Sequence, residues 1–239
     1  MPAPTTLPEV VARLQAIAGS PRSSDGVACF ARLYLAVTEG VQAELAGVTF
    51  ADQRFLARLD VVFANLFLTA LEATPAQLPR AWAPLVEGRA ARGIAPLQFA
   101  LAGMSAHINR DLPVALVATC SELGIQLEEG SPQHADYVRV NAVLAKVEAR
   151  VKRSYLTGWL RSLDRLVHRV DRLDDVVAMW DVARARDAAW VNGEALWALR
   201  EEPALSARYL LALDRMVGLT ARGFLVPADT WLQRLARAF

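Results

Sequence analysis

The residues most able to do chemistry in this chain are four polar side chains inside its most apolar stretch, 94–116. They are His107, Asn109, Arg110 and Asp111. Moving a polar group out of water without a new partner costs roughly 1–3 kcal/mol, and moving an unpaired charge costs more. We therefore expect these groups either to be satisfied inside the protein or to serve a ligand.

The spacing of His107 and Asp111 indicates acid–base chemistry. Residues four apart lie on one face of a helix and can interact. Histidine exchanges a proton near neutral pH, and a carboxylate orients its ring or stabilises its charge. We expect His107 to be the general acid/base and Asp111 to be its partner. The structural alternative is that Asp111 caps a helix beginning at Pro113 while His107 is a hydrogen-bonded core residue.

Two polar residues also interrupt an otherwise apolar helix, which we expect over 49–73. Asp60 is a candidate second catalytic carboxylate, and Asn65 is a candidate substrate-binding residue. In the structural alternative, Asp60 faces Arg58 or Arg54, and Asn65 bonds across a helix interface.

Arg186 and Trp190 are four residues apart in a late helix, so the guanidinium can pack on the indole. Arg186 could also reach Asp111 or a ligand carboxylate or phosphate. We expect Asn109 and Arg186 to hold a polar end of the substrate. The candidate apolar walls of the pocket are Tyr34, Phe63, Phe67, Phe99 and Trp190.

A metal site is the minority alternative, and we expect no cofactor. Asp164, His168 and Asp171 share a helix face and could join His107 and Asp111 in a mixed His/carboxylate site. However, their surroundings, SLDRLVHRVDRLDD, have the alternating charge of a solvated face. The chain has 3 histidines and no HExxH motif, which also disfavours a metal.

Composition excludes several classes of partner. The formal net charge is +1 and no basic helix with interleaved aromatics occurs, so we expect no nucleic-acid binding. The GxxxxGK[ST], GxGxxG and GxSxG motifs are absent. No run reaches the roughly 18 apolar residues of a membrane span, and the N-terminus lacks a signal-peptide pattern, so we predict a cytoplasmic protein. The sequence leaves open whether the protein forms a homo-oligomer.

Helical periodicity without alternating strands predicts an all-α fold, a single domain over 1–239. We expect a bundle of about eight helices around a buried central helix, with 49–73 in that place. Segment 1–22 is predicted as an arm and short helix, and 74–95 as a proline-punctuated connector. Pro96 should open the helix that carries His107, and Pro113 should kink or divide it near Arg110. Later helices are expected over 132–169, 174–199, 203–219 and 227–238.

Three segments resemble a known family: LDVVFANLFLTAL (59–71), PLQFALAGMSAHINRDLPVAL (96–116) and DVVAMWDVARARDAAW (175–190). The family is bacterial, frequent in actinobacteria, and is known only as a domain of unknown function. Its central motif reads His-Ile-Asn-x-Asp-Leu. The resemblance implies a helical single domain and no particular reaction, and Leu66 stands where a more polar residue is expected. The residues to which it points are Asp60, His107, Asn109, Asp111, Arg186 and Trp190.

From these residues we expect an enzyme that acts on a small, largely apolar metabolite by proton transfer. Cyclisation, isomerisation and hydrolysis fit, including in specialised metabolism. One alternative is a non-catalytic binding protein for a lipid-like ligand. The other is a helical interaction domain in which the polar residues form a satisfied buried network.

Overall fold

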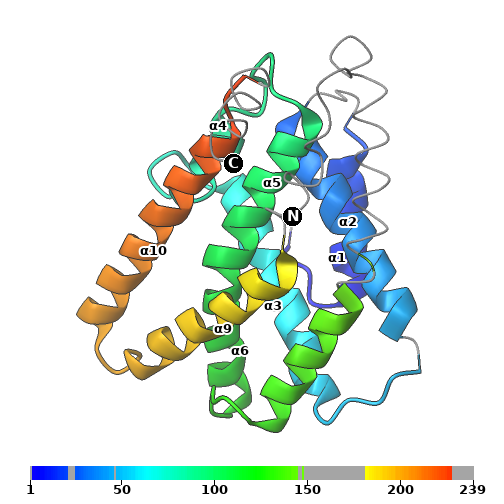
Figure 1. Cartoon of the computed structure of the whole chain (residues 1–239), viewed down its shortest axis with the longest axis vertical. Coiled ribbons are helices and arrows are strands. Elements are labelled where there is room, and N and C mark those ends of the chain that lie inside the picture. Colours follow the sequence, from blue (N-terminus) through cyan, green and yellow to red (C-terminus); the bar gives the residue numbers. More distant parts are fainter. Residues whose placement is uncertain (1, 21–24, 46, 145–146, 148–180, 228–239) are drawn as a thin grey trace, which may run out of the picture.

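The computed structural model describes residues 2–20, 25–45, 47–144, 147 and 181–227. Within these ranges the chain forms helices and connecting loops without a strand, which confirms the all-α prediction (Figure 1). The elements are α1 (Leu7–Ala18), α2 (Gly26–Leu45), α3 (Gln53–Glu72), α4 (Ala83–Glu87), α5 (Pro96–Ala106), η1 (His107–Asp111), α6 (Leu112–Leu123), helix 132–144, α9 (Val182–Ala198) and α10 (Pro203–Phe224). They pack as one domain.

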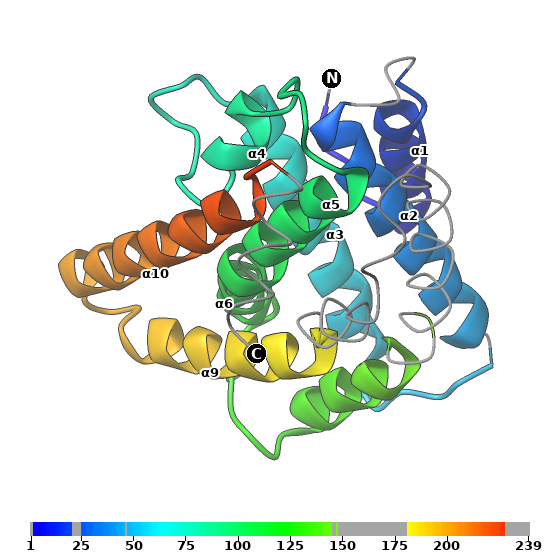
Figure 2. The ribbon, with the colours of Figure 1, turned by 45° about the horizontal axis from the view of Figure 1, so that its top comes forward.

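The central helix is α5 together with η1 and α6, rather than the predicted helix 49–73 (Figure 2). From Leu97 to Ala106 every residue of α5 is buried except the half-buried Met104. Small residues allow this because they let neighbouring helices approach closely. At Gly103, an added Cβ would lie 2.4 Å from the ring of Phe30 on α2. A helix that is apolar on all sides is stable only when other elements surround it.

Helix α3, by contrast, buries only one side. Phe55, Leu59 and Ala64 are buried, whereas Asp60 is exposed. The polar residues in this apolar segment therefore mark where the helix faces away from the core. Its start is fixed by Asp52, whose side chain accepts a hydrogen bond from the backbone N–H of Phe55 at 2.9 Å.

The residues 107–111 form a π-helical turn, where we expected a kink or a break. The backbone N–H of Leu112 donates to the carbonyl of His107, five residues earlier. Pro113 lacks an N–H and cannot donate to the carbonyl of Asn109, so the wider turn relieves the conflict without ending the helix. The side chain of Asp111 makes no capping hydrogen bond to α6, which removes the structural alternative for that residue.

Helices α3, α9 and α10 pack against this π-helical turn, and Tyr34 of α2 contacts His107 within it. Helix α9 also packs along α6, and α10 packs along α5 (Figure 2). The short helix α4 lies within the predicted connector 74–95. Among the residues that the structure describes, no helix is both long and apolar enough to cross a membrane.

Some of the sequence predictions fall outside the described ranges. They include Asp164, His168 and Asp171, residues 148–169 of the helix expected over 132–169, residues 174–180 of the helix expected over 174–199, and nearly all of the helix expected over 227–238. Helix 132–144 matches the first part of the helix predicted over 132–169.

Candidate functional site

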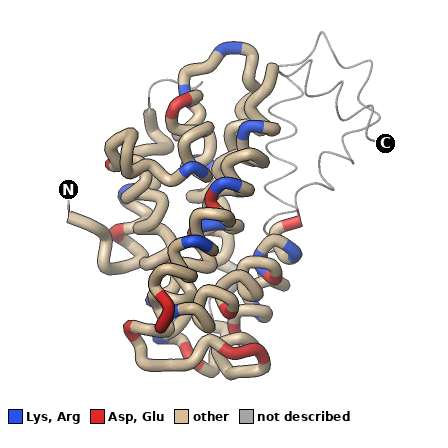
Figure 3. The backbone as a smooth tube through the Cα atoms, turned by 90° about the vertical axis from the view of Figure 1, so that its left-hand side faces the viewer, with Lys and Arg blue, Asp and Glu red and all other residues tan. Residues whose placement is uncertain are grey.

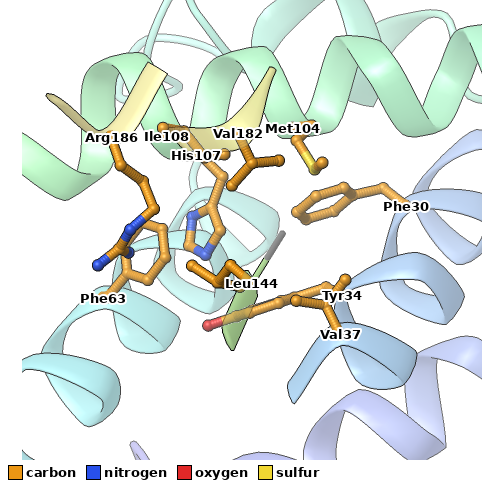
Figure 4. Close-up of a pocket in the computed structure, with 10 residues that line it drawn as sticks. All are labelled: Phe30, Tyr34, Val37, Phe63, Met104, His107, Ile108, Leu144, Val182 and Arg186. Atoms are coloured by element: carbon orange, nitrogen blue, oxygen red, sulfur yellow. The ribbon is translucent and has the colours of Figure 1, made fainter. Parts of the chain in front are cut away.

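Figure 4 shows a pocket beside the π-helical turn, with a volume of about 70 Å³. Its wall is mostly apolar and comes from α2, α3, α5, η1, helix 132–144 and α9. The lining residues are Phe30, Tyr34, Val37, Phe63, Met104, His107, Ile108, Leu144, Val182 and Arg186. His107 and Arg186 are thus brought together from sequence positions almost eighty apart, as the acid–base hypothesis requires.

His107 is 3 % exposed, and one of its two ring nitrogens is hydrogen-bonded to a described residue. Its Nδ1 lies 3.2 Å from Oδ2 of Asp111. Burial lowers the pKa of His107, although the hydrogen bond and the charge of Asp111 act in the opposite direction. The ring is therefore neutral near pH 7. Because an ion-paired carboxylate only accepts hydrogen bonds, we assign the ring proton to Nδ1.

The other ring nitrogen, Nε2, is buried and has no hydrogen-bond partner among the residues that the structure describes. Buried polar atoms are nearly always paired, so an unpaired one needs an explanation. In the assigned tautomer Nε2 carries a lone pair and can only accept. His107 lines the pocket (Figure 4), so a molecule bound there is the natural donor.

Aromatic rings fix the orientation of the imidazole. Phe63 stacks on it with 3.6 Å between centroids and 6° between planes. Tyr34 approaches in an edge-on geometry at 4.7 Å and 67°. These contacts leave the ring little freedom to rotate, and they surround it with apolar surface that favours its neutral form.

Asp111 is completely buried and receives three donors. Besides His107, the indole Nε1 of Trp82 donates to Oδ2 at 2.9 Å and Arg110 Nη1 donates to Oδ1 at 2.8 Å. Arg110 also reaches Asp214 on α10, with 3.6 Å from its Nε to the carboxylate. Asp214 in turn accepts two backbone N–H groups of the connector at 2.8 and 3.0 Å. The carboxylate that orients His107 is therefore anchored to α4 and α10.

This arrangement does not suit a metal held between His107 and Asp111. Both carboxylate oxygens already accept N–H groups, one of them from a cationic guanidinium. Across the described ranges, no group of three or more His, Cys, Asp or Glu side chains could hold a metal ion. The larger set proposed with Asp164, His168 and Asp171 lies outside those ranges.

Arg186 is 8 % exposed and is held on two sides. Its Nε donates to Oδ1 of Asn141 at 2.6 Å, and its guanidinium lies 4.0 Å from the ring centroid of Tyr137. The Tyr137 hydroxyl donates to the backbone carbonyl of Arg186 at 2.7 Å. We expected the guanidinium to pack on Trp190. Trp190 instead lies 4.9 Å from the Tyr137 ring, donates to Glu194 and does not line the pocket.

Asp60 lies near the pocket without lining it. Its side chain is exposed, yet it is close enough to the pocket to raise the pKa of Tyr34, a shift whose larger cause is burial of the phenol. Desolvation of the carboxyl group by the surrounding protein raises the pKa of Asp60 to about 6, and the charge of Arg186 opposes that rise. Because water reaches this carboxylate, screening moderates the cost of its charge. Asp60 exchanges a proton close to neutral pH.

Four other predicted site residues have structural contacts and do not line the pocket. Asn65 donates to the backbone carbonyl of Pro4 at 2.8 Å and ties down the N-terminal arm. Asn109 is 3.4 Å from the Ser105 hydroxyl. Phe67 and Phe99 are core residues.

Sequence reasoning missed the apolar residues that complete the pocket: Phe30, Val37, Met104, Ile108, Leu144 and Val182. It also missed Trp82 and Asp214, which anchor the acid–base pair. The apolar residues follow the same periodicity as core residues, so the sequence carries no separate signal for them. A lone aspartate inside the 203–219 helix was the available signal for Asp214.

A family described as a family of unknown function (DUF5995) matches residues 7–227. The chain belongs to this family. The match covers the pocket, the acid–base pair and Arg186, and it agrees with the expected membership of a family without assigned activity. No curated protein and no solved structure matches the chain. Assignment of a function to this DUF5995 member therefore depends on the geometry of the pocket.

Proposed function

We propose that this protein is an enzyme that uses His107 as a general acid/base on a small, largely apolar molecule. The observation that carries the proposal is the unpaired Nε2 of His107 at an apolar pocket, with Nδ1 held by Asp111. A base needs a free lone pair, a fixed orientation and a pKa near or below the working pH. His107 meets these three requirements.

The chemistry that fits is proton transfer. Nε2 takes a proton from a C–H or O–H group of the bound molecule, and the resulting imidazolium is stabilised by the Asp111 carboxylate. Return of that proton to another atom of the same molecule completes an isomerisation or a cyclisation, and transfer from a bound water begins a hydrolysis. Asp60, which titrates near pH 6, is a second proton donor or acceptor beside the pocket.

The replacement His107→Asn tests the proposal. The asparagine amide can donate to Asp111 from the position of Nδ1, but it has no group in place of Nε2. Wild type and variant are incubated with a bacterial metabolite extract, and compounds consumed or formed are followed by mass spectrometry. We expect conversions that the wild type performs and the variant loses by at least about a hundredfold.

His134→Asn is the matched control, because His134 does not line the pocket. It should convert the same compounds as the wild type. Equal conversion by His107→Asn and wild type would overturn the assignment of His107, as would the absence of any conversion by the wild type.

A non-catalytic binding protein is the second candidate, favoured by the mostly apolar wall and by Arg186 at its side. In that case the purified protein retains a small molecule that is released unchanged on denaturation. His107→Asn then lowers its affinity, whereas no compound in the extract is converted.

The proposal also places the protein in the cytoplasm of a bacterium. Lys146 and Lys152 are the only lysines among 26 basic residues, a bias typical of high-GC bacterial genomes. Cys120 is a buried free thiol, which suits a reducing compartment. Cell fractionation of a bacterium that carries this gene tests the compartment.

A further inference from the structure

Arg186 is a buried cation without a carboxylate partner among the described residues. Other arginines of these helices pair with acids, such as Arg110 with Asp111 at 2.8 Å and Arg89 with Asp25 at 2.7 Å. Burial of a charge is costly unless an opposite charge or several hydrogen bonds compensate it. Among the described residues, the charge of Arg186 is compensated by one hydrogen bond, one aromatic ring and a longer-range interaction with Asp60.

The contacts of Arg186 also determine which of its atoms are available. Asn141 takes Nε, and Tyr137 covers one face of the guanidinium. The terminal nitrogens, Nη1 and Nη2, have no hydrogen-bond partner in the described part of the chain, and the side chain borders the pocket (Figure 4). A guanidinium held in this way presents a fixed pair of donors whose geometry matches a carboxylate.

The charge around the pocket favours an anion with a single charge. Arg186 is the one arginine or lysine among the described residues that line the pocket, and residues of both charges occur along the described helices (Figure 3). Asp60 lies close enough to interact electrostatically with Arg186, without an ion pair within 4.0 Å. A phosphate dianion would meet one cation and one nearby carboxylate, whereas a carboxylate balances the cation alone.

The size of the pocket limits the apolar part of this ligand. A volume of about 70 Å³ is roughly half that of the apolar cavity of about 150 Å³ that binds benzene, so it encloses about three carbons. The pocket is partly open, so the rest of a chain of about five carbons extends toward its mouth. Phe30, Tyr34 and Phe63 then surround the chain, and the ring of His107 lies in the same wall.

On the basis of the function proposed above, we propose that the substrate is a small monocarboxylic acid. Its carboxylate binds the terminal nitrogens of Arg186, and its apolar chain lies in the pocket against His107. Arg186 fixes the acid group, and His107 takes a proton from a hydroxyl group or an activated C–H that the chain carries, rather than from the acid group.

Hexanoate and hexanamide are the probes, because they have nearly the same shape and differ in charge. Their binding to the purified protein is measured by calorimetry and by changes in backbone amide NMR signals. We expect hexanoate to bind about 10- to 100-fold more tightly than hexanamide, the range of a charge-assisted hydrogen bond. Equal affinities, or no saturable binding of hexanoate at millimolar concentrations, would overturn the proposal.

Arg186→Gln should lower hexanoate affinity about 10- to 100-fold and leave hexanamide affinity nearly unchanged. The control is Arg184→Gln on the same helix, since the Arg184 side chain is 88 % exposed. It should bind both probes like the wild type. Hexanoate bound equally by Arg186→Gln and wild type would contradict the role of Arg186. If Arg186→Gln does not fold, the relative affinities of the wild type for hexanoate and hexanamide still test whether the pocket binds a carboxylate.

The same probes separate this proposal from the acid–base proposal. His107→Asn should still bind hexanoate within about threefold of the wild type, because the anion contacts Arg186. If hexanoate binds as expected and His107→Asn keeps full conversion activity, the anion site is supported and the catalytic role of His107 is wrong. If conversion depends on His107 but the protein binds hexanoate and hexanamide equally, the carboxylic-acid substrate is wrong and the catalytic role of His107 stands.

Discussion

At the scale of single residues, the site consists of one neutral base and one cation. In each of them, one nitrogen is fixed by a hydrogen bond to another side chain. Asp111 holds Nδ1 of His107, and Asn141 holds Nε of Arg186. In both cases the atoms without a partner belong to side chains that line the pocket. Such preorganisation limits the freedom that each group must lose when a substrate binds.

Asp60 gives a prediction about stability. Its pKa is about 6 in the folded protein, above the 3.8 of an unperturbed aspartate, so the folded state favours the protonated form. The stability from this group is complete below about pH 3.8 and is lost as the pH rises through about 6. At about pH 7.5, Asp60→Asn should therefore be more stable than the wild type, by up to about 1 kcal/mol because water screens the charge.

Urea unfolding at several pH values measures this difference, which should shrink as the pH falls through about 6. Glu201→Gln, in the exposed turn before α10, is the control and should change stability little. An Asp60→Asn variant that is less stable than the wild type at about pH 7.5 would contradict the interpretation.

At this scale the sequence predicted the contact between His107 and Asp111 better than it predicted the residues around them. The spacing of His107 and Asp111 was sufficient because both residues lie in one helix, where the backbone fixes their separation. Phe67, Phe99 and Trp190 were predicted as pocket walls but lie elsewhere, since periodicity does not distinguish a core position from a pocket position. Arg186 was identified, but its packing on Tyr137 depends on a contact between distant helices.

At the scale of elements, the close crossing of α2 and α5 shapes the pocket. Phe30 lies against Gly103, and its ring also forms part of the pocket wall. A Cβ at position 103 would be 2.4 to 2.8 Å from three carbons of Phe30. The two helices can therefore keep this distance only with glycine at that position.

Gly103→Ala should destabilise the protein by about 1–3 kcal/mol, because overpacking outweighs the gain in helix propensity. Gly223→Ala in α10 is the matched control, since a Cβ there would meet nothing within 4 Å. It should be neutral or stabilising by up to about 1 kcal/mol. Urea unfolding of both variants measures the effects. A Gly103→Ala variant as stable as the wild type would show that α2 and α5 are not closely packed at this position.

Helix positions followed from the sequence, but the choice of the central helix did not. Both 59–68 and 97–106 are apolar, and local sequence does not reveal which one other helices surround. The small residues of α5 decide it, because alanines and Gly103 allow close approach on several sides. The π-helical turn was also beyond prediction, although Pro113 correctly located an irregularity in the helix.

At the scale of the whole molecule, the site lies where two hydrophobic clusters meet. Met104 packs against both clusters, and α5 contributes buried residues to each of them. The network around Asp111 adds links from η1 to Trp82 and, through Arg110, to α10. The two halves of the core therefore share both apolar and polar contacts.

This sharing predicts a single cooperative unfolding transition. Trp190 belongs to one cluster and Trp82 to the other, so tryptophan fluorescence reports on both, whereas far-UV circular dichroism reports on the helices. Urea transitions followed by the two methods should coincide. Two separate midpoints would show that the clusters unfold independently.

The most direct test of the central claim is the protonation state of His107. Protein labelled with ¹⁵N-histidine is studied by long-range ¹H–¹⁵N NMR, and His107→Asn assigns the signals. The account predicts a proton on Nδ1, a bare Nε2 at about pH 7, and a pKa below the usual 6.5. A proton on Nε2 or a charged ring at about pH 7 would contradict it, because His107 would then have no free lone pair with which to accept a proton in the pocket.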